Sequence, residues 1–183
     1  MELIWAVVII VGVVIVWLIL TYNGLIRSRN RVEEAWSDIE VQLKRRYDLI
    51  PNIVNTVKGY AKHEDSVFTK VTQARAAAMG AKSMEDHAKA ENMLSETLKS
   101  LFAVSENYPQ LQASDNFLHL QHELTDAEDK IQASRRFYNS NVRDFNTKLQ
   151  VFPTNLVAGT LGFKDREFFD APDVALEAPT VKF

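Results

Sequence analysis

The chain opens with an apolar stretch that runs from Leu3 to Leu20 without a charged or amide side chain. At ~1.5 Å per residue, a helix of this length extends roughly 27 Å, close to the ~30 Å hydrocarbon core of a bilayer. A signal peptide needs a basic start, a shorter apolar stretch and small residues at a cleavage site, whereas Glu2 is the only charge before this run. Tryptophans near both ends would suit the two lipid–water interfaces. The pattern predicts a retained transmembrane helix over residues 1–22, anchored by Leu3, Trp5, Gly12, Trp17 and Leu20.

A second pattern, an apolar heptad repeat, extends from Arg27 to Met79 and predicts an amphipathic helix that buries one face. One set of positions seven apart is Arg29, Trp36, Leu43, Ile50, Val57, Glu64, Val71 and Ala78, and its companion is Val32, Ile39, Arg46, Ile53, Tyr60, Val67 and Ala74. Pro51 removes a backbone donor, so we expect a kink there. The repeat keeps its phase through the proline, which argues against a reversal at that point. The junction at Asn23-Gly24 has low helix propensity and could act as a swivel.

Two further amphipathic segments follow. Ser83 and Asp86 have the spacing of an N-cap pair, and the helix they begin carries leucines on one face until Pro109. Ser114 begins the last segment, whose large residues again repeat every seven positions: Phe117, Leu124, Ile131, Tyr138, Phe145 and Phe152. Pro153 ends this segment, and a short helical turn is expected near Leu156–Leu161.

The predicted fold is all-α: an N-terminal transmembrane helix followed by an antiparallel bundle of three to four long helices, the first kinked near Pro51. The expected divisions are an anchor over residues 1–22, the long-helix bundle over 23–152, and a short helical turn with a C-terminal tail over 153–183.

The charges that flank the apolar run predict its orientation. Arg27, Arg29 and Arg31 follow it closely, and no basic side chain precedes it. The positive-inside rule then places the N-terminus outside and the helical domain in the cytoplasm, with these arginines near the lipid headgroups of the cytoplasmic membrane. The chain carries a net charge of only −3, which does not suggest a nucleic-acid partner.

Candidate catalytic chemistry is sparse. The chain has no cysteine, and it contains neither a glycine-rich phosphate loop nor a Gly-x-Ser-x-Gly elbow. The best metal candidate is His119, His122 and Glu123, which lie on one side of a helix; relative to Phe117 and Leu124, however, both histidines should point outward. We therefore expect no enzymatic activity, no cofactor and no small-molecule substrate.

Several charged residues interrupt the predicted helix faces. Arg46 falls at a seam position, and an unpaired guanidinium in a bundle would cost several kcal/mol, so a carboxylate partner or a rim position is expected. The run Arg135, Arg136, Phe137 and Tyr138 mixes cations with aromatic rings, as protein interfaces do. The alternative is that the C-terminal segment, including Phe168 and Phe169, folds over it. The chain ends with an alternating apolar pattern in which Val181 and Phe183 could dock on a partner.

Several of these segments resemble the bacterial LemA family, and the similarity extends over essentially the whole chain. The matching segments are Tyr22-Asn23, Arg29–Ile39, Gln42–Arg46, Asp48–Asn52, Val57–Tyr60, Ala74–Ala76, Glu106–Pro109, Asn116-Phe117, Ser134–Asn139, Phe152–Asn155, Gly162-Phe163 and Pro179–Phe183. The resemblance implies an N-terminal transmembrane helix with a bundle of long antiparallel helices. It implies no catalytic or cofactor residues that could be carried over.

Together these observations predict a membrane-anchored, non-enzymatic helical scaffold or adaptor that contacts the bilayer and either a protein partner or further copies of itself. The alternative is a metal-binding enzyme or sensor that uses His119, His122 and Glu123. A transporter subunit is less consistent with the sequence, because the span has a single glycine and no ionisable residue.

Overall fold

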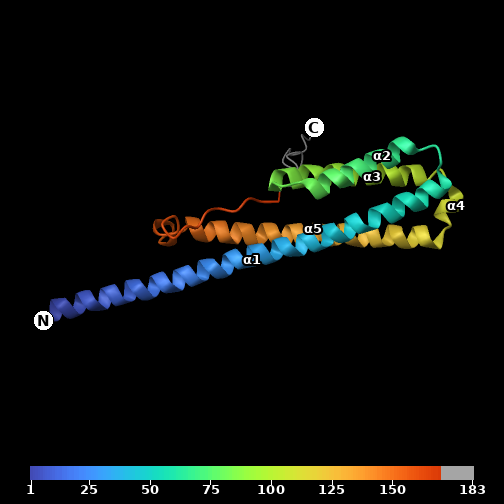
Figure 1. Cartoon of the computed structure of the whole chain (residues 1–183). Coiled ribbons are helices and arrows are strands. Elements are labelled where there is room, and N and C mark those ends of the chain that lie inside the picture. Colours follow the sequence, from blue (N-terminus) through green and yellow to red (C-terminus); the bar gives the residue numbers. More distant parts are fainter. Residues whose placement is uncertain (170–183) are drawn as a thin grey trace, which may run out of the picture. The chain divides into compact units, whose positions relative to one another are not determined.

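The computed structural model describes residues 1–169, and within them every regular element is a helix. The long helices are α1 (Glu2–Tyr60), α2 (Asp65–Gly80), α3 (Met84–Ser105) and α5 (Asp115–Gln150) (Figure 1). A four-residue helix, α4 (Pro109–Gln112), links α3 to α5, and a 3₁₀ turn, η1 (Thr154–Leu156), follows α5. The all-α prediction is confirmed.

Helix α1 continues from the apolar run into the amphipathic region without a break. Asn23 and Gly24 are both helical, so no swivel is formed at this junction, and Pro51 also lies inside the helix. The expected absence of a reversal at Pro51 is therefore confirmed.

One expected helix is in fact two. The heptad repeat predicted continuity to Met79, but α1 ends at Tyr60 and the chain reverses direction through residues 61–64 before α2 begins. Tyr60, placed in the seam by the repeat, is 44% exposed, while Phe68, outside both heptad sets, is buried. Gly59 weakens the end of α1, and the acidic pair Glu64-Asp65 favours a new helix N-terminus. The repeat kept its phase across the turn by coincidence.

The residues form two compact units. The first comprises Met1–Ser37 with Arg136–Phe168, and the second comprises Asp38–Arg135 with, among the described residues, Phe169. The boundary between them falls inside both α1 and α5.

In the first unit, Phe163, in the segment that follows α5, packs against aromatic rings of both α1 and α5. The Phe163 ring lies 5.8 Å from that of Tyr22 and 6.4 Å from that of Phe145, centroid to centroid. The Asn146 side chain donates to the carbonyl of Arg166 and accepts from its amide, both at 2.9 Å. These contacts order the backbone that follows α5.

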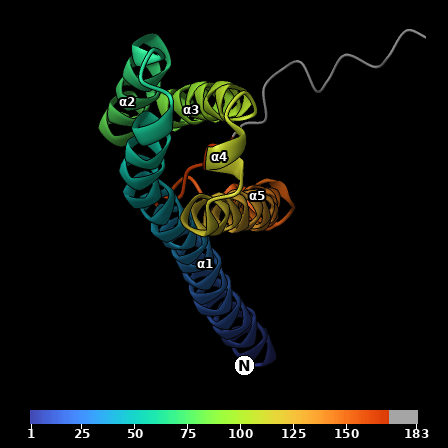
Figure 2. The same cartoon turned by 90° about the vertical axis from the view of Figure 1, so that its right-hand side faces the viewer.

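In the second unit, the α1 residues from Asp38 onward, α2, α3 and the α5 residues up to Arg135 run alternately in opposite directions, and α2 lies against α3 (Figures 1 and 2). Ser83 caps α3 by accepting from the Asp86 amide at 3.0 Å, as its spacing predicted. The buried apolar side chains include Ile39, Ile50, Ile53, Val71, Leu94, Leu101, Leu111, Phe117 and Ile131.

Helix α5 ends earlier than the aromatic repeat suggested. The first five members of the repeat are buried, but the helix stops at Gln150 and Phe152 is 77% exposed. The residue before a proline is disfavoured in helical conformation, so Pro153 terminates the helix before Phe152 can join the seam.

Candidate functional site

The most unusual surface of the molecule is the first part of α1. Leu3–Val16 are all exposed along an unbroken helix, and α1 is the one helix among residues 1–169 that is long and apolar enough to cross a membrane. Trp5 and Leu20 are exposed, Trp17 is partly covered, and no side-chain or backbone atom would obstruct a Cβ at Gly12. This surface matches the dimensions of a bilayer and has no counterpart that covers it within the described residues.

The basic residues after this surface are not equivalent. Arg27 and Arg31 are exposed, whereas Arg29 is partly buried and its Nε lies 3.7 Å from a carboxylate oxygen of Glu33. Glu33 also pairs with Arg166 at 2.9 Å. Two of the three arginines predicted to meet lipid headgroups are therefore free of carboxylates within the described residues.

A buried cluster of charged and polar side chains lies inside the second unit. Arg46 on α1 is 1% exposed, and its Nη2 forms an ion pair with Glu91 on α3, which is equally buried. Nη1 of Arg46 donates to Glu128 on α5 at 2.5 Å and to the Ser95 hydroxyl at 3.1 Å. The Tyr47 hydroxyl donates to the other carboxylate oxygen of Glu91. We call these five side chains the Arg46 cluster; the carboxylate partner expected for Arg46 is confirmed.

The electrostatics of the cluster follow from its burial. Removal from water raises the pKa of Tyr47, so this phenol stays protonated as a hydrogen-bond donor. The neighbouring Arg135 lies in a poorly solvated position, and burial lowers its pKa to about 10. The guanidinium of Arg135 stacks 4.3 Å from the centre of the Phe169 ring, and its buried Nε makes no hydrogen bond.

The arrangement suits structural specificity better than catalysis. Each carboxylate of the cluster is held by Arg46, which leaves neither free as a base or nucleophile. Glu128, at 29% exposed, and the partly exposed Ser95 line a hollow of about 320 Å³ between α3 and α5. A cluster that joins three helices through one guanidinium fixes their relative register.

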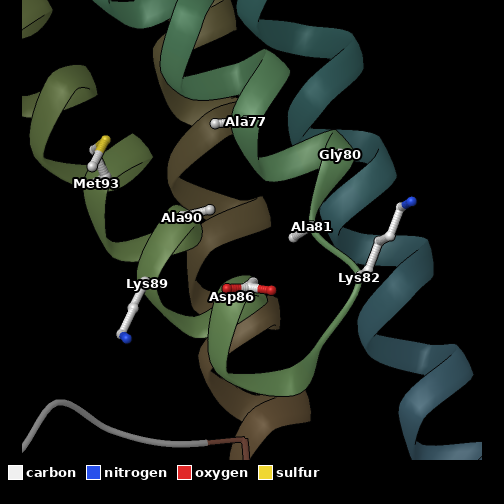
Figure 3. Close-up of a pocket in the computed structure, with 8 residues that line it drawn as sticks. All are labelled: Ala77, Gly80, Ala81, Lys82, Asp86, Lys89, Ala90 and Met93. Carbon is white, nitrogen blue, oxygen red and sulfur yellow. The ribbon is translucent and has the colours of Figure 1, made fainter.

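A second hollow, of about 420 Å³, lies where α2 ends and α3 begins (Figure 3). Its lining combines small or apolar residues, among them Ala77, Ala90 and Met93, with charged side chains, and those of Lys82 and Lys89 point away from each other. The Asp86 carboxylate already accepts from Ser83 at 2.6 Å. No set of polar groups converges on a ligand position in this hollow.

The histidine-based metal alternative finds no geometric support. His119 and His122 are exposed, while a carboxylate oxygen of Glu123 accepts from Arg45 at 2.5 Å. Among residues 1–169, no group of three or more histidine, aspartate or glutamate side chains is placed to hold a metal ion.

The run expected at an interface is divided between covered and open positions. Arg135 lies under Phe169, and the buried Tyr138 donates from its hydroxyl to the carbonyl of Glu167 at 3.0 Å. Arg136 and Phe137 are exposed, Phe137 at 56%. The chain after α5 thus covers half of the run, and the expected contacts of Val181 and Phe183 lie outside the described residues.

Sequence reasoning missed Glu91, the fully buried carboxylate of the Arg46 cluster. Glu91 precedes Leu94, Leu98 and Leu101 at helical spacing, so it belongs to the buried face of α3. A carboxylate at a buried position, considered together with the seam arginine, was the available signal.

Comparison with known proteins gives a consistent assignment. The sequence model described as the LemA family matches residues 35–183. Protein LemA of Metamycoplasma hominis is 29% identical over 153 residues, which cover 83% of this chain and 70% of that protein. Magnetosome protein MamQ 2 of Paramagnetospirillum magneticum is 26% identical, and magnetosome protein MamQ of Magnetospirillum gryphiswaldense 25%, each over 178 residues. The chain spans 65% of the length of either MamQ protein.

Proposed function

The chain belongs to the LemA family, and from this premise we propose that it is a single-pass membrane protein whose helical domain acts as a non-enzymatic scaffold or adaptor. One observation carries the proposal: the apolar surface of residues 3–16 is exposed on a helix that continues without a break into the amphipathic region. Such a surface is costly in water and favourable in lipid.

The proposed orientation places the N-terminus outside and the residues after the span in the cytoplasm. Its support is the position of Arg27 and Arg31, which are exposed and follow the span closely. Because the natural chain lacks cysteine, single substitutions report topology without background. In intact cells a membrane-impermeant maleimide should label Glu2→Cys, and it should label Lys62→Cys only after permeabilisation. The reverse pattern, or labelling of both variants in intact cells, would contradict the orientation.

The scaffold role is supported by an exposed cation and an exposed aromatic ring at consecutive positions of α5. Arg136 and Phe137 are residue types enriched in protein interfaces, and neither is covered by the described chain. Apolar exposure by itself is common, so a control of equal exposure is needed. Val41 on α1, at 60% exposed, provides one.

A photo-crosslinking amino acid placed at Phe137 or at Val41 in cells tests this role. We expect a discrete protein adduct from position 137 and none from position 41. The mass of the adduct separates a second copy of this chain from a different protein. Equal adducts from both positions, or none from 137, would contradict the assigned contact surface.

A further inference from the structure

The segment between the end of α5 and the buried Phe163 is apolar and uncharged. Residues 151–161, here called the 151–161 loop, contain no acidic or basic side chain. Four large apolar residues in it are exposed, led by Phe152 at 77% and Leu156 at 67%, with Val151 and Leu161 also open. Grouped exposure of this kind on a short segment marks a contact surface rather than ordinary scatter.

The loop lies close to the residues of α1 that follow the apolar run, within the same unit. Thr154 and Lys148 line a small hollow together with Thr21, Gly24 and Leu25. Lys148 donates to the Ser28 hydroxyl. The turns that follow α5 therefore lie beside residues 21–28, directly after the last residue of the apolar run.

The distances place the loop at the depth of the lipid headgroups. From Leu20 to Gly24 a helix rises ~6 Å. The headgroup layer on each side of a bilayer is roughly 5–7 Å thick, the difference between the full thickness and the hydrocarbon core. A segment that contacts Thr21 and Gly24 then lies within the headgroup layer when the run from Leu3 to Leu20 spans the core.

Several backbone groups of the loop are hydrogen-bonded within the loop, which suits an environment poor in water. The amide of Asn155 donates to the carbonyl of Val151 at 3.0 Å, that of Ala158 to Thr154 at 2.9 Å, and that of Leu161 to Val157 at 2.9 Å. Internal hydrogen bonds lower the cost of moving backbone groups out of water. Ala158 is buried, so the inner side of the loop is fixed while the outer apolar side chains remain open.

We propose that the 151–161 loop is a second membrane contact, which inserts Phe152 and Leu156 into the lipid interface beside the transmembrane helix. The inference rests on the proposed membrane anchoring of α1. A lipid surface fits better than a protein partner because the loop lies beside the residues that directly follow the span and carries no charge. Lys148 and Lys164 flank it, where basic side chains can meet anionic headgroups.

The experiment uses the full chain, reconstituted in vesicles of phosphatidylcholine and phosphatidylglycerol. Spin labels are attached to single cysteines introduced as Phe152→Cys, Leu156→Cys, Val13→Cys or Val41→Cys. Collision of each label with oxygen, which is enriched in lipid, is compared with collision with a water-soluble nickel chelate. Val13 reports the span itself, and Val41 is an exposed residue ~30 Å beyond Leu20 along α1.

The expected result is an oxygen-to-nickel collision ratio at positions 152 and 156 severalfold above that at 41 and approaching that at 13. A lipid-like ratio at 13 with a water-like ratio at 152 and 156 would overturn the loop contact and leave the anchor intact. A water-like ratio at 13 would overturn the anchor and the loop contact together. Shielding at 152 from both reagents, with spectral broadening that disappears when labelled and unlabelled chains are mixed, would assign the loop to contact between copies and overturn the lipid assignment.

Discussion

Helix α1 contains two regions whose exposure is opposite to what their chemistry favours in water. Residues 3–16 keep apolar side chains outside, whereas Arg46, further along the same helix, is buried at 1% exposure. The first arrangement becomes favourable when lipid replaces water, and the second when carboxylates replace it around the guanidinium. Each region is therefore stable only in its own surroundings, lipid for the apolar side chains and carboxylates for Arg46. Substitutions that make those surroundings unfavourable test each region.

The largest effect is expected from charges in the apolar region. Ile9→Asp combined with Val13→Asp should raise the free energy of membrane insertion by about 5–7 kcal/mol, since each central aspartate costs about 2.5–3.5 kcal/mol. The fraction of protein kept in membranes after alkaline carbonate extraction should fall sharply. Ile9→Leu with Val13→Leu serves as the control and should extract like the natural chain. Full retention of the doubly charged variant would remove the case for a lipid-exposed span.

Loss of the buried cation should have the next largest effect. Arg46→Met leaves the carboxylate of Glu91 buried without its partner, and the free energy of unfolding should fall by about 3–5 kcal/mol. The denaturant midpoint of the full chain in mild detergent measures this. The control is the same variant with Glu91→Gln added, which removes the stranded charge and should recover part of the loss. A loss below 1 kcal/mol for Arg46→Met would mean that the ion pair is solvated.

A smaller effect is expected at Arg135, which makes a useful contrast with Arg46. Arg135→Met removes a cation whose pKa burial lowers to about 10, and the thioether can still contact the Phe169 ring. The free energy of unfolding should change by no more than about 1 kcal/mol, in either direction. A loss as large as that for Arg46→Met in the same denaturation experiment would show that Arg135 has an equally important partner.

The smallest effect is expected at the half-buried network of Arg45. Its guanidinium donates to Glu123 at 2.5 Å and to Asp126 at 2.7 Å. The hydrogen bond from Arg45 lowers the pKa of Glu123, and those from Lys130 and then Arg45 lower the pKa of Asp126. Both carboxyls have a lower pKa when folded, so their contribution is present above the ordinary carboxyl range and is lost as the pH falls through the folded values.

Arg45→Ala should accordingly be slightly less stable than the natural chain at neutral pH. The difference should shrink as the pH falls below about 4, where the carboxylates are protonated in both proteins. Melting temperatures recorded at several pH values provide the test. A difference that stays constant down to the acid limit would assign the effect to lost packing of the arginine stem.

The fold could be predicted from the sequence wherever a pattern of residues was compatible with only one structure. The helix over the apolar run, the Ser83 cap and the buried repeat from Phe117 to Phe145 all had this property, and the structure confirms them. The turn after Tyr60 did not, because a repeat of seven continues in phase whether the chain goes straight on or folds back. The weak helix end at Gly59 and the acidic start at Glu64 were the local signals that periodicity concealed.

The candidate site was predictable only in part, for a different reason. A seam arginine requires a partner, which the sequence alone could state, but the partner's identity depends on which helices meet. Glu91 and Glu128 lie on separate helices, 45 and 82 residues beyond Arg46, at positions that only tertiary packing brings together. The exposure of Phe152 could not be predicted from the aromatic repeat, which placed this residue on the buried face. The helix ends before Phe152 because Pro153 follows it.

Two hydrogen bonds in the first unit join residues that lie far apart in the sequence, so they can form only late in synthesis. Lys148 reaches Ser28 across 120 residues, and Arg166 reaches Glu33 across 133. At ~5–20 residues per second, the ribosome needs roughly 6–27 s to supply the later partner of each pair. During that interval Leu25, Val32 and Ala35, which are buried in the finished protein, emerge without the helix that covers them. Early membrane insertion of the N-terminal helix would then keep the unfinished chain at the membrane while the ribosome makes its C-terminal half.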